Sequence, residues 1–371
     1  MNNARDTIIS SAVDIEFLEA LSSCYSLFGE YKEEVLKTAL IISENRSLTE
    51  MIDKLAEYVK KSTCNEAKAI SFPETGDTST DLMIPLFILL PSVDSAVDLY
   101  EKRGFSRHEV ISFLGDDFRR CLSLTKMNNG NAGIDKIYYG WLCLYMKCEI
   151  FDHGIFNFQP QKFNSDMIVL KNRRTDDVFP VALCGKYHSS GLASGSAGCT
   201  DDSSSFEVVY SETEDLFNGH PVYKGKVSSS SQAFKKSEWE CILRKGDDVL
   251  GLHIPRGVKL TDENTKAFLK SGMEKARRAF PEYSFKCISC HSWLLDPVLG
   301  DILGESSNIA VFAGNFLRFP VKSNGMGIFG FVFPRNYESF EDLPESTRLQ
   351  RELKKMYING RYIYVYGGVI I

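Results

Sequence analysis

The sequence of 371 residues lacks a long hydrophobic run, an excess of basic charge and a recognisable leader segment. Its longest apolar run is residues 82–90, which Pro85 interrupts, whereas a bilayer span needs about twenty apolar residues. The net charge of −6 does not favour nucleic acid as a partner. Residues 1–6 lack the basic and apolar regions of a signal peptide. We therefore expect a cytoplasmic protein that binds neither nucleic acids nor membranes.

The ten cysteines lack the density and spacing of a disulfide scaffold, so we expect free thiols. Only one Cys-x-x-Cys motif occurs, formed by Cys287 and Cys290 and followed by His291. In a strand, side chains three positions apart point to opposite faces of the sheet. The motif is therefore a poor zinc or redox site, and we expect no metal.

The first part of the chain has the apolar periodicity of helices. Two segments have the form of a capping box: Ser47 with Glu50, and Ser106 with Glu109. A helix over residues 93–103 is expected to stop at Gly104, and a further helical pattern covers residues 134–151. This region predicts an all-helical N-terminal domain, residues 1–152.

After Gly154 the sequence changes to β-prone segments separated by polar loops. The Gly/Ser-rich stretch 189–205 is expected to be a mobile surface loop rather than a phosphate-binding loop, since no Gly-Lys-Ser/Thr follows it. Predicted strands include residues 240–243, 249–254, 285–293, 309–312, 328–333 and 362–371, with helices after Thr261 and over 343–357.

Strands that alternate with helices predict a partly parallel sheet covered by helices. We expect residues 240–243 and 249–254 to form a hairpin within it, because Gly246-Asp247-Asp248 reads as a turn. The fold class predicted is α+β, with residues 153–371 forming a mixed sheet flanked by helices.

Two segments together resemble a known protein family. The first is Val249-Leu250-Gly251-Leu252-His253-Ile254-Pro255, and the second is Ser292-Trp293-Leu294-Leu295-Asp296-Pro297 with the following Ser307-Asn308-Ile309. The family occurs mostly in Gram-positive bacteria, and its members combine a helical N-acyltransferase-type N-terminal domain with a GNAT-like C-terminal domain. The resemblance implies a GNAT-like fold and transfer of an acyl group from acyl-coenzyme A, either acetyl-CoA or a longer thioester.

In a GNAT-like fold, two parallel strands splay apart and the thioester lies between them. The resemblance assigns these strands to residues 249–254 and 285–293. Cofactor-binding residues would then be Leu252 and Ile254 on the first strand, Arg256, Gly257 and Lys259 in the loop after it, Trp293 as a wall and Asn308 at the cleft. This loop departs from the family pattern, because only Arg256-Gly257 matches it and two acidic residues begin the next helix.

The candidate catalytic residues are His253, His291 and Cys290, at the carboxyl ends of two adjacent strands where open α/β sheets bind ligands. His253 is the favoured base, because a neutral imidazole takes a proton from an amine near neutral pH. A small-molecule or peptide amine would be the acceptor. Two hypotheses stay open: an acyl-CoA-dependent N-acyltransferase, and a non-catalytic GNAT-fold module that binds a small molecule or a protein.

Overall fold

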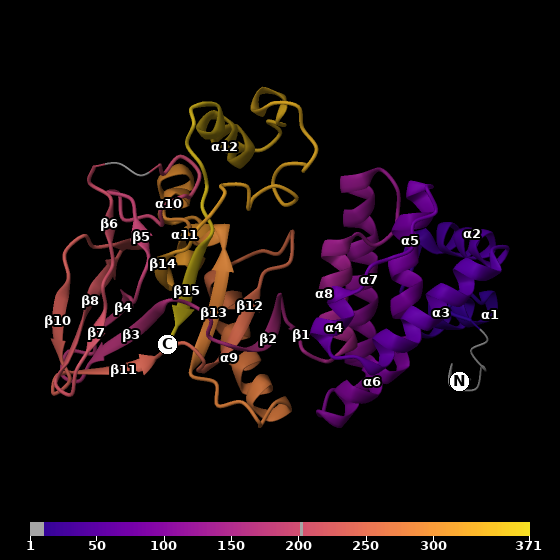
Figure 1. Ribbon diagram of the computed structural model, residues 1–371, viewed down its shortest axis with the longest axis horizontal. Coiled ribbons are helices and arrows are strands. Elements are labelled where there is room, and N and C mark those ends of the chain that lie inside the picture. The colour runs from indigo at the N-terminus through magenta and orange to yellow at the C-terminus, as the bar shows by residue number, and fades with distance from the viewer. Residues whose placement is uncertain (1–10, 201–202) are drawn as a thin grey trace. The chain divides into compact units, whose positions relative to one another are not determined.

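The protein, described here from a computed structural model, divides into two compact units at Phe151/Asp152. The structure describes residues 11–200 and 203–371. Each unit has its own hydrogen-bonded elements and buried core (Figure 1).

The first unit is helical over residues 15–146. Its elements are α1 (Ile15–Tyr25), η2 (Gly29–Tyr31), α2 (Lys32–Ser43), α3 (Arg46–Lys61), α4 (Cys64–Ala69), α5 (Thr78–Leu89), η3 (Leu90–Ser92), α6 (Val93–Lys102), α7 (Arg107–Asn129) and α8 (Lys136–Met146). The predicted stripe behind Ser106 is buried, with Val110, Leu114 and Phe118 fully enclosed.

Two sequence predictions for this unit need correction. Asn45, not Ser47, caps α3, because its side chain accepts the backbone N–H of Leu48 and the helix already begins at Arg46. Pro85 does not break its apolar run, since it lies inside α5. The helical run Thr78–Lys102 thus has the length and composition of a membrane span. However, 67% of its most apolar 18-residue stretch is buried within the protein, as in a core helix.

The second unit contains two main sheets. A six-stranded sheet has the order β1-β2-β12-β13-β15-β14, and a seven-stranded antiparallel group is built around β10-β8-β4-β3-β11. The first sheet comprises β1 (Phe151–His153), β2 (Phe156–Lys162), β12 (Asp248–His253), β13 (Cys287–Ser292), β14 (Leu317–Pro320) and β15 (Tyr366–Ile370). The second comprises β3 (Met167–Asn172), β4 (Val178–Ala182), β7 (Ser211–Glu212), β8 (Leu216–Tyr223), β9 (Lys226–Val227), β10 (Gln232–Lys235) and β11 (Trp239–Leu243), while β5 (Lys186–Tyr187) pairs with β6 (Phe206–Glu207).

Helical elements contact the six-stranded sheet at β2 and at β15. The long helix α9 (Asp262–Ala279) lies against β2, where Phe158 packs over Gly272 (Figure 1). The remaining helical elements are η4 (Trp293–Leu295), α10 (Val298–Leu303), α11 (Asn308–Gly314), η5 (Phe340–Asp342) and α12 (Arg348–Ile358). In Figure 1, α12 and its neighbouring loops lie beyond the carboxyl end of β13.

The predicted hairpin is wrong, because its two strands belong to different sheets. The strand β11 pairs with β3, with a bulge between Cys241 and Leu243. Both edges of β12 are occupied by other strands, β2 and β13. Local turn chemistry at Gly246 suggested the hairpin, but partners distant in sequence decide the pairing.

Two predicted strands in the last third are also wrong. Residues 309–312 lie in α11, which Ser307 caps by accepting the backbone N–H of Ala310 at 3.3 Å. Residues 328–333 form turns closed by an isolated bridge between Phe329 and Phe333. Short apolar runs do not distinguish a strand from a short buried helix or turn.

Candidate functional site

The parallel pair β12–β13 stops pairing before either strand ends. The register joins Val249 to Cys287 and ends with Gly251 opposite Ser289. The strand β12 continues to His253, still paired with β2, and β13 continues to Ser292, still paired with β15. Both strands are thus held by their outer neighbours while they separate from each other. Beyond Gly251 and Ser289 their carboxyl ends are not paired with each other, and this unpaired region is called the opening below.

Alternation along the strands places the two histidines on the same face. Val249 and Cys287 both belong to the buried cluster that includes Val169 and Leu243 of the second sheet. Side chains two and four positions along a strand share its face, so His253 and His291 lie on this side too. Extending the register by two pairs would set these histidines opposite each other. Because the ladder has ended before these positions, one imidazole lies on each of the two unpaired strand ends.

His253 is half-buried and has a fixed polar neighbour. Its Nε2 lies 2.9 Å from Oε1 of Gln159, a residue of β2 that pairs with Gly251 and therefore shares the face of His253. With the amide oxygen as acceptor, this contact assigns the proton to Nε2 and holds the ring in one orientation. The lone pair of the imidazole is then on Nδ1.

His291 is exposed to solvent, yet it lies among enough protein atoms for desolvation to lower its pKa. Its ring meets the ring of Phe319 edge-on, at 6.2 Å between centroids. A lowered pKa keeps the imidazole neutral, the form in which it accepts a proton.

Cys290 points to the other face of the sheet and is 1% exposed. Burial raises the pKa of its thiol to about 12. A thiol with this pKa is almost entirely protonated near neutral pH, so it is a weak nucleophile. The structure therefore favours a packing role for Cys290 over the predicted catalytic one.

The loop after β12 carries the predicted phosphate-binding residues. Arg256 and Lys259 are exposed, and Gly257 has a φ of +84° in open space. Helix α9 follows, capped by Thr261. Asp262 in its first turn is paired with Lys266 at 2.7 Å. This ion pair partly offsets the negative charge that the sequence places beside the loop.

The other predicted cofactor residues have different environments. Leu252 is buried on the face that α9 covers, opposite Phe158, and Ile254 follows the last residue of β12. Trp293 is partly buried in η4 and packs against the aromatic cluster beside α12. Asn308 is exposed as the first residue of α11 rather than preceding a strand.

Sequence reasoning missed Asp296, which fixes the chain just beyond β13. Its carboxylate accepts the backbone N–H of Tyr364 at 2.8 Å and that of Val298 at 3.0 Å. The side chain is 4% exposed, and burial raises its pKa to about 6. The local signal was an Asp directly before Pro297 at the start of a helix. Its partner 68 residues away was not visible in the sequence.

Fold and site together define an α+β protein whose central parallel strands separate at their carboxyl ends. Residues 152–370 match the model of the GNAT-like C-terminal domain family, and the chain belongs to this family. The predicted α+β class and GNAT-like C-terminal region are thereby confirmed. The N-acyltransferase type of the helical region and the Gram-positive origin stay predictions.

Solved structures of acyltransferases have a similar fold. A mutant acyltransferase in complex with octanoyl-CoA is 16% identical and superimposes with a TM-score of 0.65, covering 96% of this chain and 87% of that chain. An acyltransferase in complex with decanoyl-CoA and teicoplanin is 17% identical, with a TM-score of 0.64 and the same coverage. No curated protein matches the sequence. At such identities the likeness is one of fold.

Proposed function

We propose that this protein transfers an acyl group from a coenzyme A thioester to an amine. The single observation that carries the proposal is the early end of the β12–β13 ladder at Gly251 and Ser289. The backbone edge of β12 beyond Gly251 is not paired with β13, so it is available to the amides of a pantetheine arm. The acyl-CoA complexes of similarly folded acyltransferases support this choice of donor.

The chemistry needs one proton acceptor and one proton donor at the opening. The amine nitrogen attacks the thioester carbonyl, a C–N bond forms, and the C–S bond breaks. A neutral histidine takes the proton that the amine loses and gives it to the departing sulfur, which leaves as coenzyme A thiol. His253, oriented by Gln159, is the proposed base, and His291 faces the same opening from the other strand.

The donor's phosphates are assigned to the loop between β12 and α9. Arg256 and Lys259 supply positive charge there, and the backbone at Gly257 adopts a conformation that glycine tolerates without strain. The N-terminus of α9 adds a partial positive charge. Exposed contacts of this kind each contribute about 1 kcal/mol or less.

Calorimetric titration with octanoyl-CoA tests the proposal, together with mass-spectrometric detection of coenzyme A released in the presence of amines. We expect micromolar binding and turnover in the unchanged protein. His253→Ala should keep binding and lower turnover by about 10²–10⁴-fold. His108→Ala, at an exposed position of α7, is the matched control and should change neither quantity. No octanoyl-CoA binding at concentrations well above ~100 μM would rule the proposal out.

A non-catalytic binding module is the second candidate. The observation in its favour is the reduced phosphate loop, in which Arg256-Gly257 is followed by two acidic residues at the start of α9. A module of this kind would bind octanoyl-CoA and release no coenzyme A with any amine tested. Its binding would be equally insensitive to His253→Ala, so turnover alone separates the two candidates.

A further inference from the structure

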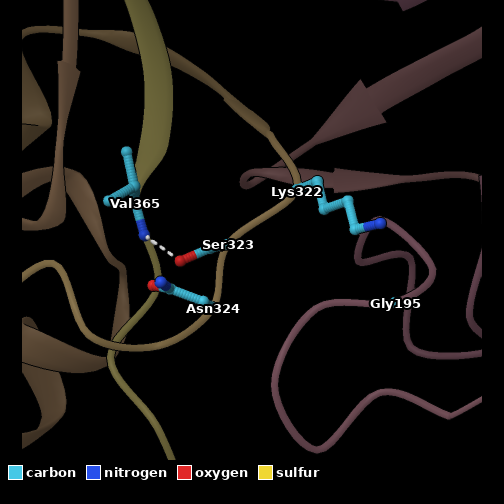
Figure 2. A pocket seen from close by; sticks show the side chains of 5 residues that line it. All are labelled: Gly195, Lys322, Ser323, Asn324 and Val365. Atoms are coloured by element: carbon cyan, nitrogen blue, oxygen red, sulfur yellow. Dashed lines mark hydrogen bonds between the residues drawn. The ribbon is translucent and has the colours of Figure 1, made fainter.

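A pocket outside the proposed thioester site lies at the same edge of the six-stranded sheet. Its volume is about 440 Å³, and its lining residues are Gly195, Lys322, Ser323, Asn324 and Val365. Lys322, Ser323 and Asn324 follow one another on one segment, and Figure 2 shows the side chain of Lys322 reaching toward Gly195 while Ser323 and Asn324 point toward the segment of Val365. The pocket therefore joins the Gly/Ser-rich stretch to the segment that follows β14.

The Gly/Ser-rich stretch is tied down at this point. The backbone N–H of Ala197 donates to the carbonyl of Ser323 at 2.9 Å, and the N–H of Ser323 donates to Oγ of Ser196 at 3.1 Å. The hydroxyl of Tyr364 donates to the carbonyl of Ala197 at 2.8 Å. These bonds make residues 195–197 a defined wall, in place of the expected mobile loop.

Glycine at position 195 leaves room for the lysine. Gly195 has a φ of +76°, and a Cβ there would lie 3.2 Å from Cε of Lys322. A side chain at this position would thus crowd the lysine stem. The lysine itself has no carboxylate within ion-pair distance among residues 11–200 and 203–371.

The other polar groups of the pocket are donors. Ser323 Oγ accepts two backbone N–H groups, from Val365 at 3.0 Å and Gly325 at 3.3 Å, so its own proton remains to be donated. Asn324 Oδ1 accepts the N–H of Met326 at 3.0 Å. Among the residues that the structure describes, the lining contains no carboxylate. The ammonium of Lys322 gives the pocket a cationic group that suits an anion.

The pocket is adjacent to the carboxyl end of β13. Val365 directly precedes β15, whose Tyr366 pairs with Ser292. A Cβ on Gly327 would lie 2.8 Å from Cγ2 of Val365 and 3.8 Å from Cβ of Trp293, so one glycine touches both. Lys322 follows β14, two strands from β13, a separation of about 10 Å at ordinary strand spacing.

We propose that this pocket binds the carboxylate of the acceptor, which is therefore an amine of the amino-acid or short-peptide type. This inference rests on the proposed acyl transfer. An acceptor whose amine lies at the opening and whose carboxylate lies near Lys322 spans about 10 Å, or three extended residues. The phosphates of coenzyme A are the other source of an anion, but their loop follows β12, on the opposite side of the opening.

Backbone amide NMR of the full chain with triglycine, triglycinamide and coenzyme A tests this inference. Triglycine up to ~50 mM should shift the amides of Gly195, Ser323 and Val365 saturably, and triglycinamide should not. Lys322→Met should weaken triglycine binding by about 10–100-fold. Lys270→Met, at an exposed position of α9, is the matched control and should leave it unchanged. Coenzyme A should shift the amides of residues 252–254 and 256–260 and leave those of Gly195, Ser323 and Val365 unshifted.

Three results of the peptide titrations would overturn the inference: no saturable shift with triglycine, equal shifts with triglycinamide, or triglycine binding that survives Lys322→Met. Shifts of the pocket amides by coenzyme A would assign the anion to the donor's phosphate, and would also overturn it. Octanoyl-CoA calorimetry on the same sample keeps the two claims apart. Intact octanoyl-CoA binding without a triglycine response sinks the acceptor pocket alone, whereas absent octanoyl-CoA binding sinks the proposed function.

Discussion

Replacing Gly272 by alanine should destabilise the second unit, although alanine favours helices. Gly272 lies inside α9, where its missing side chain leaves space for the buried ring of Phe158. A Cβ at this position would lie 2.3 Å from Cζ and 2.5 Å from Cε2 of that ring. Carbon atoms in contact are normally about 3.5–4.0 Å apart, so helix and strand must separate by about 1 Å.

Two opposing terms set the magnitude. Glycine to alanine in a helix interior gains about 1 kcal/mol of stability. Overpacking of a closed core costs about 1–3 kcal/mol, and the upper half applies because Phe158 is 0% exposed and its ring has no free space to enter. The net loss should be about 1–2 kcal/mol, or roughly 3–6 °C in the Tm of this 220-residue unit.

Gly314→Ala is the matched control for scanning calorimetry and urea unfolding. Gly314 is the last residue of α11 and is exposed. A Cβ added at this position would have no neighbouring atom within 4 Å. Its replacement should stabilise by up to about 1 kcal/mol, the opposite sign. Adding Phe158→Leu to Gly272→Ala should recover part of the loss. If Gly272→Ala stabilises as Gly314→Ala does, α9 does not cover the face of the sheet that carries Leu252.

Three further predictions concern the site. Replacing both Arg256 and Lys259 by alanine should weaken octanoyl-CoA binding by about 5–30-fold and flatten its salt dependence in calorimetry; an unchanged Kd would contradict the assigned phosphate loop. Desolvation lowers the pKa of His291 from its ordinary value of 6.5, so the imidazole stays neutral down to a lower pH. If transfer needs the neutral form, kcat/KM should begin to fall only at pH values below 6.5. A fall of kcat/KM on acidification that has its midpoint above pH 6.5 would contradict the geometry. Asp296 has a folded pKa of about 6 against 3.8 in the unfolded chain, so the folded state takes up a proton first and gains stability as pH falls from 7 to 4. Asp296→Asn should lack this gain in urea unfolding at both pH values, and an equal gain in the variant would refute the assignment.

Features that depend on neighbours in the sequence were predictable. Ser106 and Thr261 cap α7 and α9 as their hydroxyls and spacing predict, and the order β12–α9–β13 follows from apolar strands around an amphipathic helix. Failures occurred where the partner is distant in sequence. The pairing of β11 with β3, 70 residues away, has no local signal that outweighs the turn at Gly246.

The candidate site divides in the same way. Strand ends, and hence His253 and His291, were visible as the last residues of apolar runs. That both imidazoles share one face follows only from the register of β12 with β13. Asp296 was missed because its importance comes from the N–H of Tyr364. Lys322 was missed because its pocket is completed by a loop more than 120 residues earlier in the chain.

The central claim is that the backbone of β12 beyond Gly251 receives the pantetheine arm of an acyl-CoA. The most direct measurement is a crystal structure of the protein with the non-reactive thioether analogue of octanoyl-CoA. The account predicts density for the arm between the carboxyl ends of β12 and β13, with its amides hydrogen-bonded to the backbone of residues 252–254 and its acyl end near His253 and His291. Density bound elsewhere, or β12 and β13 closed by a continuous ladder in the presence of the analogue, would contradict it.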